Sequence, residues 1–99
     1  MKLKTVKKIV VDSLNYVLTE NDIKNISVDD NTEIFGSKSL IDSLQLINLI
    51  VKIEEHIYGQ LGKEIIVVDD EAIIVGNSPL QTVQSLAEFV HKKVLLVED

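Results

Sequence analysis

The chain has 99 residues, with 10 lysines, 16 acidic residues, a formal net charge of −6, and no cysteine, arginine or tryptophan. This length suits a single domain, residues 1–99, which buries roughly two-thirds of its unfolded surface around one modest core. The absence of cysteine excludes disulfides, a thiolate nucleophile and cysteine-ligated zinc, and net acidity without arginine argues against nucleic-acid binding.

Hydropathy along the chain argues against a membrane-spanning segment. The longest unbroken apolar runs have four residues, as in residues 65–68, whereas a spanning helix needs about 20. The lysine-rich start is like the first part of a signal peptide, but Asp12, Asn15 and Glu20 interrupt the apolar stretch and no small-residue cleavage site follows. We therefore expect a folded cytoplasmic monomer without membrane insertion.

Residues 2–19 have the apolar spacing of an amphipathic helix, with steps of three and four. The stripe consists of Leu3, Val6, Val10, Leu14, Val17 and Leu18. The helix is expected to stop at residues 20–22, where Glu, Asn and Asp favour a turn. Residues 20–42 show no apolar periodicity, so we predict a long connection there.

A second helix is predicted to begin at Asp42 or Ser43 and to run to about Tyr58, with Gly59 and Gly62 as stop signals. Asp42 and Gln45 have the spacing of a capping box. On a helical wheel the core face consists of Leu46, Ile50, Ile53 and Ile57, with Ile47 and Leu49 at its flanks.

Residues 63–77 are ambiguous: 63–68 resemble a strand, and 69–75 favour a short helix with acids in its first turn. A last helix is predicted to start after Ser78 or at Thr82, and its stripe consists of Val83, Leu86, Ala87, Val90, Val94 and Leu95. The predicted fold class is all-α, a small three- to four-helix bundle with a long first loop.

Sequence signatures of catalysis and metal binding fail when they are tested. Lys38 does not follow a glycine, so residues 36–39 are no phosphate-binding loop, and the acids from Asp29 onward lack the glycine and final glutamate of a calcium loop. The two histidines, His56 and His91, stand far apart without a metal-binding spacing, and no nucleophile elbow surrounds Ser43. We therefore predict that the chain is not an enzyme.

Ser43 stands at the junction of the long connection and the second helix, where its hydroxyl is expected to be exposed. A phosphate ester on that oxygen would face the first-turn N–H groups and the positive end of the helix dipole, which stabilises an anion by roughly 0.3–1 kcal/mol at an exposed site. Ser43 is thus chemically suited to carry a phosphodiester.

This region resembles the acyl carrier proteins and peptidyl carrier domains. The resemblance rests on Asp42-Ser43-Leu44, on the helix that ends in Ile53-Glu54-Glu55, on Phe35-Gly36 in the loop before it, and on Thr82-Val83 at the last helix. It covers nearly the whole chain. In that family a transferase attaches 4′-phosphopantetheine from coenzyme A to the serine, and the thiol of the arm carries its cargo as a thioester.

The resemblance implies that Ser43 is the attachment site of 4′-phosphopantetheine and that the thiol comes from the cofactor, which fits a chain without cysteine. It implies an acyl or aminoacyl carrier in fatty acid, polyketide or nonribosomal peptide biosynthesis. The implied partners are a phosphopantetheinyl transferase, a loading ligase, and downstream synthases or transferases.

The wheel also predicts an outward arc on the second helix, opposite its core face. In the family this face contacts partner enzymes, so the candidate partner residues are Asp42, Leu44, Asn48, Val51, Glu54 and Glu55. Scattered surface hydrophobics, which are common on proteins, are the alternative interpretation of Leu44 and Val51.

Two departures point away from a housekeeping fatty-acid carrier and toward a stand-alone carrier of a specialised pathway. Gln45, Asn48 and Lys52 replace acids that such carriers have on the second helix, and residues 59–79 form a longer stretch than theirs. In that stretch, Asp69–Glu71 is either a solvated helix start or a second partner contact. The alternative to a carrier is an unmodified helical interaction module, either a degenerate carrier or an adaptor.

Overall fold

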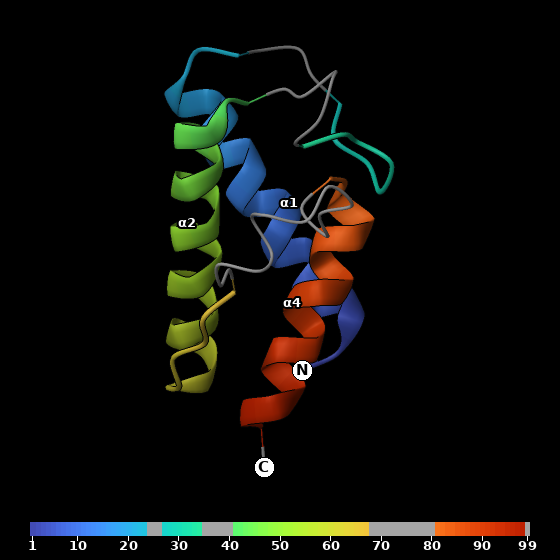
Figure 1. Cartoon of the computed structure of the whole chain (residues 1–99), viewed down its shortest axis with the longest axis vertical. Helices are drawn as coiled ribbons and strands as arrows, with labels where there is room; N and C mark the ends of the chain where they lie inside the picture. Colours follow the sequence, from blue (N-terminus) through green and yellow to red (C-terminus); the bar gives the residue numbers. More distant parts are fainter. Residues whose placement is uncertain (24–26, 35–40, 68–80, 99) are drawn as a thin grey trace.

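The structure is a computed structural model that describes residues 1–23, 27–34, 41–67 and 81–98. Its helices are α1 (Leu3–Glu20), α2 (Ser43–Leu61) and α4 (Val83–Val97) (Figure 1). The described ranges contain no strand, and their single β-bridge joins Glu33 to Thr82. Helix α1 packs against both α2 and α4, so the all-α small bundle expected from the sequence is confirmed.

Helix α1 matches its prediction to within one residue at each end. Its buried side chains lie three or four residues apart and form one stripe: Val6, Ile9, Val10, Ser13, Leu14, Val17 and Leu18. The N-terminal ammonium pairs with the Glu98 carboxylate, and His91 Nε2 lies 3.0 Å from the carbonyl oxygen of Met1. These contacts hold the start of α1 against the last turns of α4.

Helix α2 begins at Ser43, one of the two predicted positions, but the prediction of its end is wrong. The helix continues past Tyr58 to Leu61, and Gly59 lies inside it. Gly62 is the stop signal, because its φ of 69° is the left-handed conformation that glycine adopts readily. Leu61, partly buried against the core, favours the additional helical turn.

The core face of α2 is shifted toward one side of the predicted arc. Leu49 is fully buried with Leu46, Ile50, Ile53 and Ile57, but Ile47 is 58% exposed, so its placement beside the core was wrong. At about 100° per residue, Leu49 lies at one edge of the buried arc, roughly 55° from its centre, whereas Ile47 lies beyond the opposite edge, roughly 105° from that centre.

Helix α4 begins at Val83 after Thr82, and therefore at the later of the two predicted positions. The hydroxyl of Thr82 accepts a hydrogen bond from the N–H of Ser85, and the Ser85 side chain bonds back to the N–H of Thr82. The buried stripe matches the prediction apart from Leu95, which is 54% exposed. Leu95 lies about 120° from the centre of that stripe.

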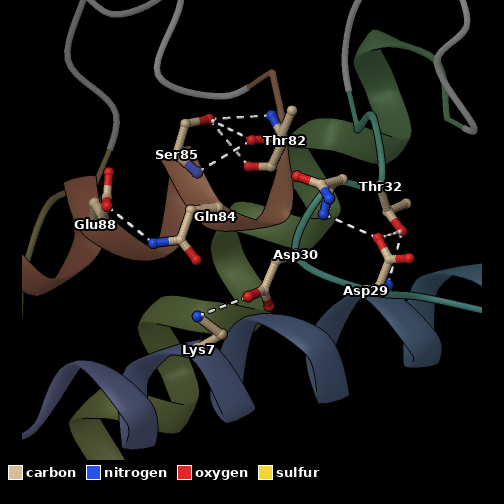
Figure 2. A network of polar contacts seen from close by, with 9 residues as sticks. Lys7, Asp29, Asp30, Thr32, Thr82, Gln84, Ser85 and Glu88 are labelled. Carbon is tan, nitrogen blue, oxygen red and sulfur yellow. Dashed lines mark hydrogen bonds and ion pairs between the residues drawn. The ribbon is translucent and has the colours of Figure 1, made fainter.

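Residues 29–34 are fastened to the start of α4 by backbone hydrogen bonds. The N–H groups of Val83 and Gln84 donate to the carbonyls of Thr32 and Asp30, at 3.1 and 3.0 Å. Asp30 also pairs with Lys7 of α1 at 3.0 Å, so this segment touches two helices (Figure 2). The first N–H groups of α4 are thereby satisfied within the protein.

Residues 63–67 run back beside the end of α2 as an extended segment (Figure 1). Ile65 and Val67 are buried and Ile66 is 72% exposed, which is the alternation expected of a strand, although the described ranges contain no sheet partner for it. The N–H of Val67 donates to Glu54 at 2.9 Å, and Lys63 Nζ donates to the carbonyl of Val97 at 2.8 Å.

Three predictions lie outside the described residues: the short helix at 69–75, the contact at Asp69–Glu71, and the loop motif Phe35-Gly36. Within the described ranges, none of the helices has the length and apolar character that would let it cross a membrane.

Candidate functional site

The junction that precedes α2 is held in place on both sides of residue 42. Ile41 is 3% exposed and belongs to the core cluster. Asp42 Oδ1 accepts a hydrogen bond from the N–H of Gln45 at 2.8 Å, and Gln45 Oε1 accepts one from the N–H of Asp42 at 2.9 Å. The predicted capping box is confirmed, and it sets the direction in which α2 begins.

Ser43 is the first residue of α2. We expected its hydroxyl to be exposed, but the Ser43 side chain lies outside the described part of the structure. Helix α2 has 19 residues and a capped first turn, so its start carries the partial positive charge of the helix dipole. This charge would stabilise a phosphate ester at the first residue of the helix.

The outward face of α2 carries an apolar stripe that no described element covers. We call this set the α2 stripe: Leu44 (68% exposed), Ile47 (58%), Val51 (46%) and Tyr58 (53%). Its spacing of three, four and seven residues keeps the four side chains on one side of the helix. The sequence predicted Leu44 and Val51 here, whereas it assigned Ile47 to the core flank and gave Tyr58 no role.

Asn48 and Glu55, both exposed as predicted, lie on the side of the α2 stripe that faces α1. They line a hollow of about 490 Å³ between the two helices, together with Tyr16, Val17, Glu20, Asn21, Val51 and Lys52. Lys52 bridges the helices there, because its Nζ lies 4.1 Å from the centre of the Tyr16 ring and 3.9 Å from Glu55.

Tyr16 is a residue of this surface that the sequence did not indicate. Its ring is 48% exposed and lies beside α2. The Glu20 carboxylate, by accepting a hydrogen bond from the Tyr16 hydroxyl and by its negative charge, raises the pKa of Tyr16 above the ordinary value of 10.0. Tyr16 lies off the buried stripe of α1, and no local pattern shows which helix it meets.

A second hollow, of about 460 Å³, lies between α2 and the segment that follows it. We call it the Glu64 groove; it is lined by Val51, Glu54, Glu55, Tyr58, Glu64, Ile65 and Ile66. Glu54, a predicted partner residue, is half-buried here and accepts the hydrogen bond from Val67. Glu54 therefore fixes the extended segment against α2, whether or not it also contacts a partner.

The described side chains of this face provide apolar surface, carboxylates and hydroxyls. Across the described ranges, no three histidine, cysteine, aspartate or glutamate residues come together as a metal site would require. No family model matches the chain, and no curated protein or solved structure matches it.

Proposed function

We propose that the chain is an acyl or aminoacyl carrier that bears 4′-phosphopantetheine on Ser43 and serves a specialised biosynthetic pathway in the cytoplasm. The observation that carries the proposal is the combination of Asp42-Ser43-Leu44 with a capped helix start at this serine. The motif supplies the attachment residue, and the helix start suits the charge of the phosphodiester.

The α2 stripe supports the second requirement of a carrier, a surface that partner enzymes bind in turn. Leu44 directly follows the attachment residue, and Ile47 and Val51 extend the apolar surface along the helix. A phosphopantetheinyl transferase, a loading ligase and the downstream synthases would each contact this face. The carrier performs no chemistry of its own; its tether raises the effective concentration of the cargo at each enzyme.

The test is the intact mass of the protein after incubation with coenzyme A, magnesium and a broad-specificity phosphopantetheinyl transferase. We expect wild type to gain the mass of one phosphopantetheine and Ser43→Ala to gain none. Ser27→Ala, which changes an exposed serine outside the helices, serves as the matched control and is expected to react like wild type.

A second candidate function is an interaction module without a prosthetic group, which the α2 stripe also favours since an exposed apolar surface suits any protein partner. In that case Ser43 only starts the helix. An unmodified wild type would favour this module over a carrier, and modification that persists in Ser43→Ala would contradict the assigned site.

A further inference from the structure

The start of α1 and the end of α4 meet at one end of the molecule (Figure 1). The N-terminal ammonium pairs with the Glu98 carboxylate, and the carbonyl oxygen of Met1 lies 3.0 Å from His91 Nε2. Lys63, which follows α2, donates from its Nζ to the carbonyl of Val97 at 2.8 Å. Segments from both ends of the sequence and from its middle thus converge on the last turns of α4.

This end of the molecule is rich in lysine, although the whole chain has a net charge of −6. Glu98 is already paired with the N-terminal ammonium, and Glu88, one turn before Lys92, accepts a hydrogen bond from Gln84 at 2.8 Å. Among the described residues, positive charge is therefore in excess here. We call the following set the basic end: Lys2, Lys4, Lys92, Lys93, Leu95 and Leu96.

The two leucines of the basic end project from the last turns of α4. Leu95 is 54% exposed and Leu96 is 81% exposed, so no described element covers them. Leu95 lies within one turn of both residues that contact Met1, and it is therefore next to the start of α1. Lys92, four residues before Leu96, lies on the same outward side of the helix.

An aromatic ring lies beside these leucines. Phe89 is partly buried against the core, and Lys93 Nζ lies 5.2 Å from the centre of its ring. Neither of the two hollows described above includes a residue of the basic end. The basic end is therefore a projecting surface, with apolar side chains at its centre and lysines beside them.

We propose that the basic end binds the surface of an anionic lipid bilayer. Leu95 and Leu96 enter the boundary between headgroups and acyl chains, while the ammonium groups of the neighbouring lysines meet the lipid phosphates. Each lysine near an anionic leaflet adds to the attraction. The contact is peripheral and needs no helix that spans the bilayer.

The type of cation favours lipid over an acidic protein as the occupant. Lysine is a point charge on a flexible stem, which suits headgroups that move laterally. The fixed carboxylates of a protein are matched better by the planar fork of arginine, and the chain has no arginine. A leucine that is 81% exposed on a projecting helix end also suits insertion between headgroups.

The basic end lies far from the start of α2. Figure 1 shows α2 beginning near the top of the view and α4 ending at the bottom, along the longest dimension of 38 Å. A bilayer bound at the basic end therefore leaves the start of α2 facing away from it. The inference goes beyond the proposed function and does not depend on modification of Ser43.

The first arm of the test measures co-sedimentation of the unmodified protein with lipid vesicles. One set contains phosphatidylcholine alone, and the other contains equal parts of phosphatidylcholine and phosphatidylglycerol. We expect binding to the mixed vesicles at low ionic strength, release at high salt, and no binding to phosphatidylcholine alone, because the attraction is electrostatic and screened by salt.

Two variants test the charge. Lys4→Gln combined with Lys92→Gln is expected to weaken binding to the mixed vesicles about tenfold, because each change removes one charge from the basic end. The matched control combines Asn15→Asp with Gln81→Glu, which changes the net charge by the same amount at exposed positions elsewhere. It is expected to bind almost as wild type does.

A second pair of variants tests the apolar contact. Leu96→Ala is expected to weaken binding about three- to fivefold, because less apolar surface enters the bilayer. Leu44→Ala is the control, since Leu44 is 68% exposed at the start of α2. It is expected to leave vesicle binding unchanged.

The second arm locates the contact by NMR. Short-chain dihexanoyl phosphatidylglycerol is titrated into isotope-labelled protein, with dihexanoyl phosphatidylcholine and polyglutamate in parallel titrations. We expect the largest amide shifts at residues 2–4 and 92–97 with the anionic lipid, and small shifts with the other two.

The inference is overturned by equal binding to neutral and anionic vesicles, or by a loss of binding in Leu44→Ala with none in Leu96→Ala. Lysine-dependent binding of polyglutamate without vesicle binding also overturns it and indicates an acidic protein partner. Both arms use unmodified protein, so their failure leaves the carrier proposal standing. A wild type that gains no mass with coenzyme A likewise leaves the lipid contact standing.

Discussion

Ser13 is the one polar side chain that is buried among the described residues, and its hydroxyl has no hydrogen-bond partner there. A buried polar group without a partner loses its bonds to water and gains nothing in return. Ser13 also lies inside α1, where serine favours the helix less than alanine does. Both effects oppose folding at this position.

Ser13→Ala is therefore expected to raise the free energy of unfolding by about 1 kcal/mol, because it removes the unpaired hydroxyl from the core. Chemical denaturation followed by circular dichroism measures the change. Ser27→Ala, at an exposed position, is the control and is expected to leave the stability unchanged. A loss of stability in Ser13→Ala would mean that the hydroxyl has a partner that stabilises the fold.

Among the helices, α2 does most to define the candidate site, and its two ends are specified by different chemistry. Its start depends on side-chain hydrogen bonds between Asp42 and Gln45. Its end depends on backbone conformation, since Gly62 is left-handed with φ of 69° whereas Gly59 is helical. Two glycines three residues apart thus have opposite conformational requirements.

Alanine at these two glycines is expected to change stability in opposite directions. Gly59→Ala is expected to stabilise by about 0.5–1 kcal/mol, because alanine favours the helix interior and an added Cβ meets nothing within 4 Å. Gly62→Ala is expected to destabilise by about 1 kcal/mol, because the left-handed conformation is costly for alanine. Thermal and urea unfolding of the two variants tests the pair, and equal shifts would contradict the assigned end of α2.

Across the protein, the buried and exposed apolar residues have separable roles. Helix α1 lies against both α2 and α4, and its Leu14 is fully buried. Leu44, in contrast, projects from the far side of α2 and is 68% exposed. Stability should therefore depend on the first leucine and partner binding on the second.

Leu14→Ala is expected to cost about 2–5 kcal/mol, a large part of the roughly 5–15 kcal/mol that stabilises a small domain. Leu44→Ala is expected to change stability by less than about 0.5 kcal/mol. Urea denaturation of both variants makes the comparison. A destabilised Leu44→Ala would show that the α2 stripe is covered by the protein's own chain and is unavailable to partners.

The elements that local sequence specifies were predicted well. The apolar period located the three described helices, and the spacing of Asp42 and Gln45 identified the cap of α2, because caps and periodicity depend on residues a few positions apart. For α4 the sequence left two starts open, after Ser78 or at Thr82, and the structure has the later one. The boundary at Tyr58 was misplaced because two glycines offered a stop and only the fold selects between them. The assignment of Ser43 as an attachment residue came from the motif and remains a prediction.

Features of this chain that depend on tertiary packing could not be predicted from the sequence in the same way. Whether Ile47 or Leu49 joins the core depends on the angle at which α2 meets its neighbours, and both lie near the edge of the same apolar arc. Tyr16 meets Lys52, and Glu64 lies beside Glu54, only after helices and returning chain come together. The sequence thus specified its helices and caps through short-range hydrogen bonding and periodicity, whereas the shape and charge of the candidate surface follow from contacts between distant segments, which no local pattern encodes.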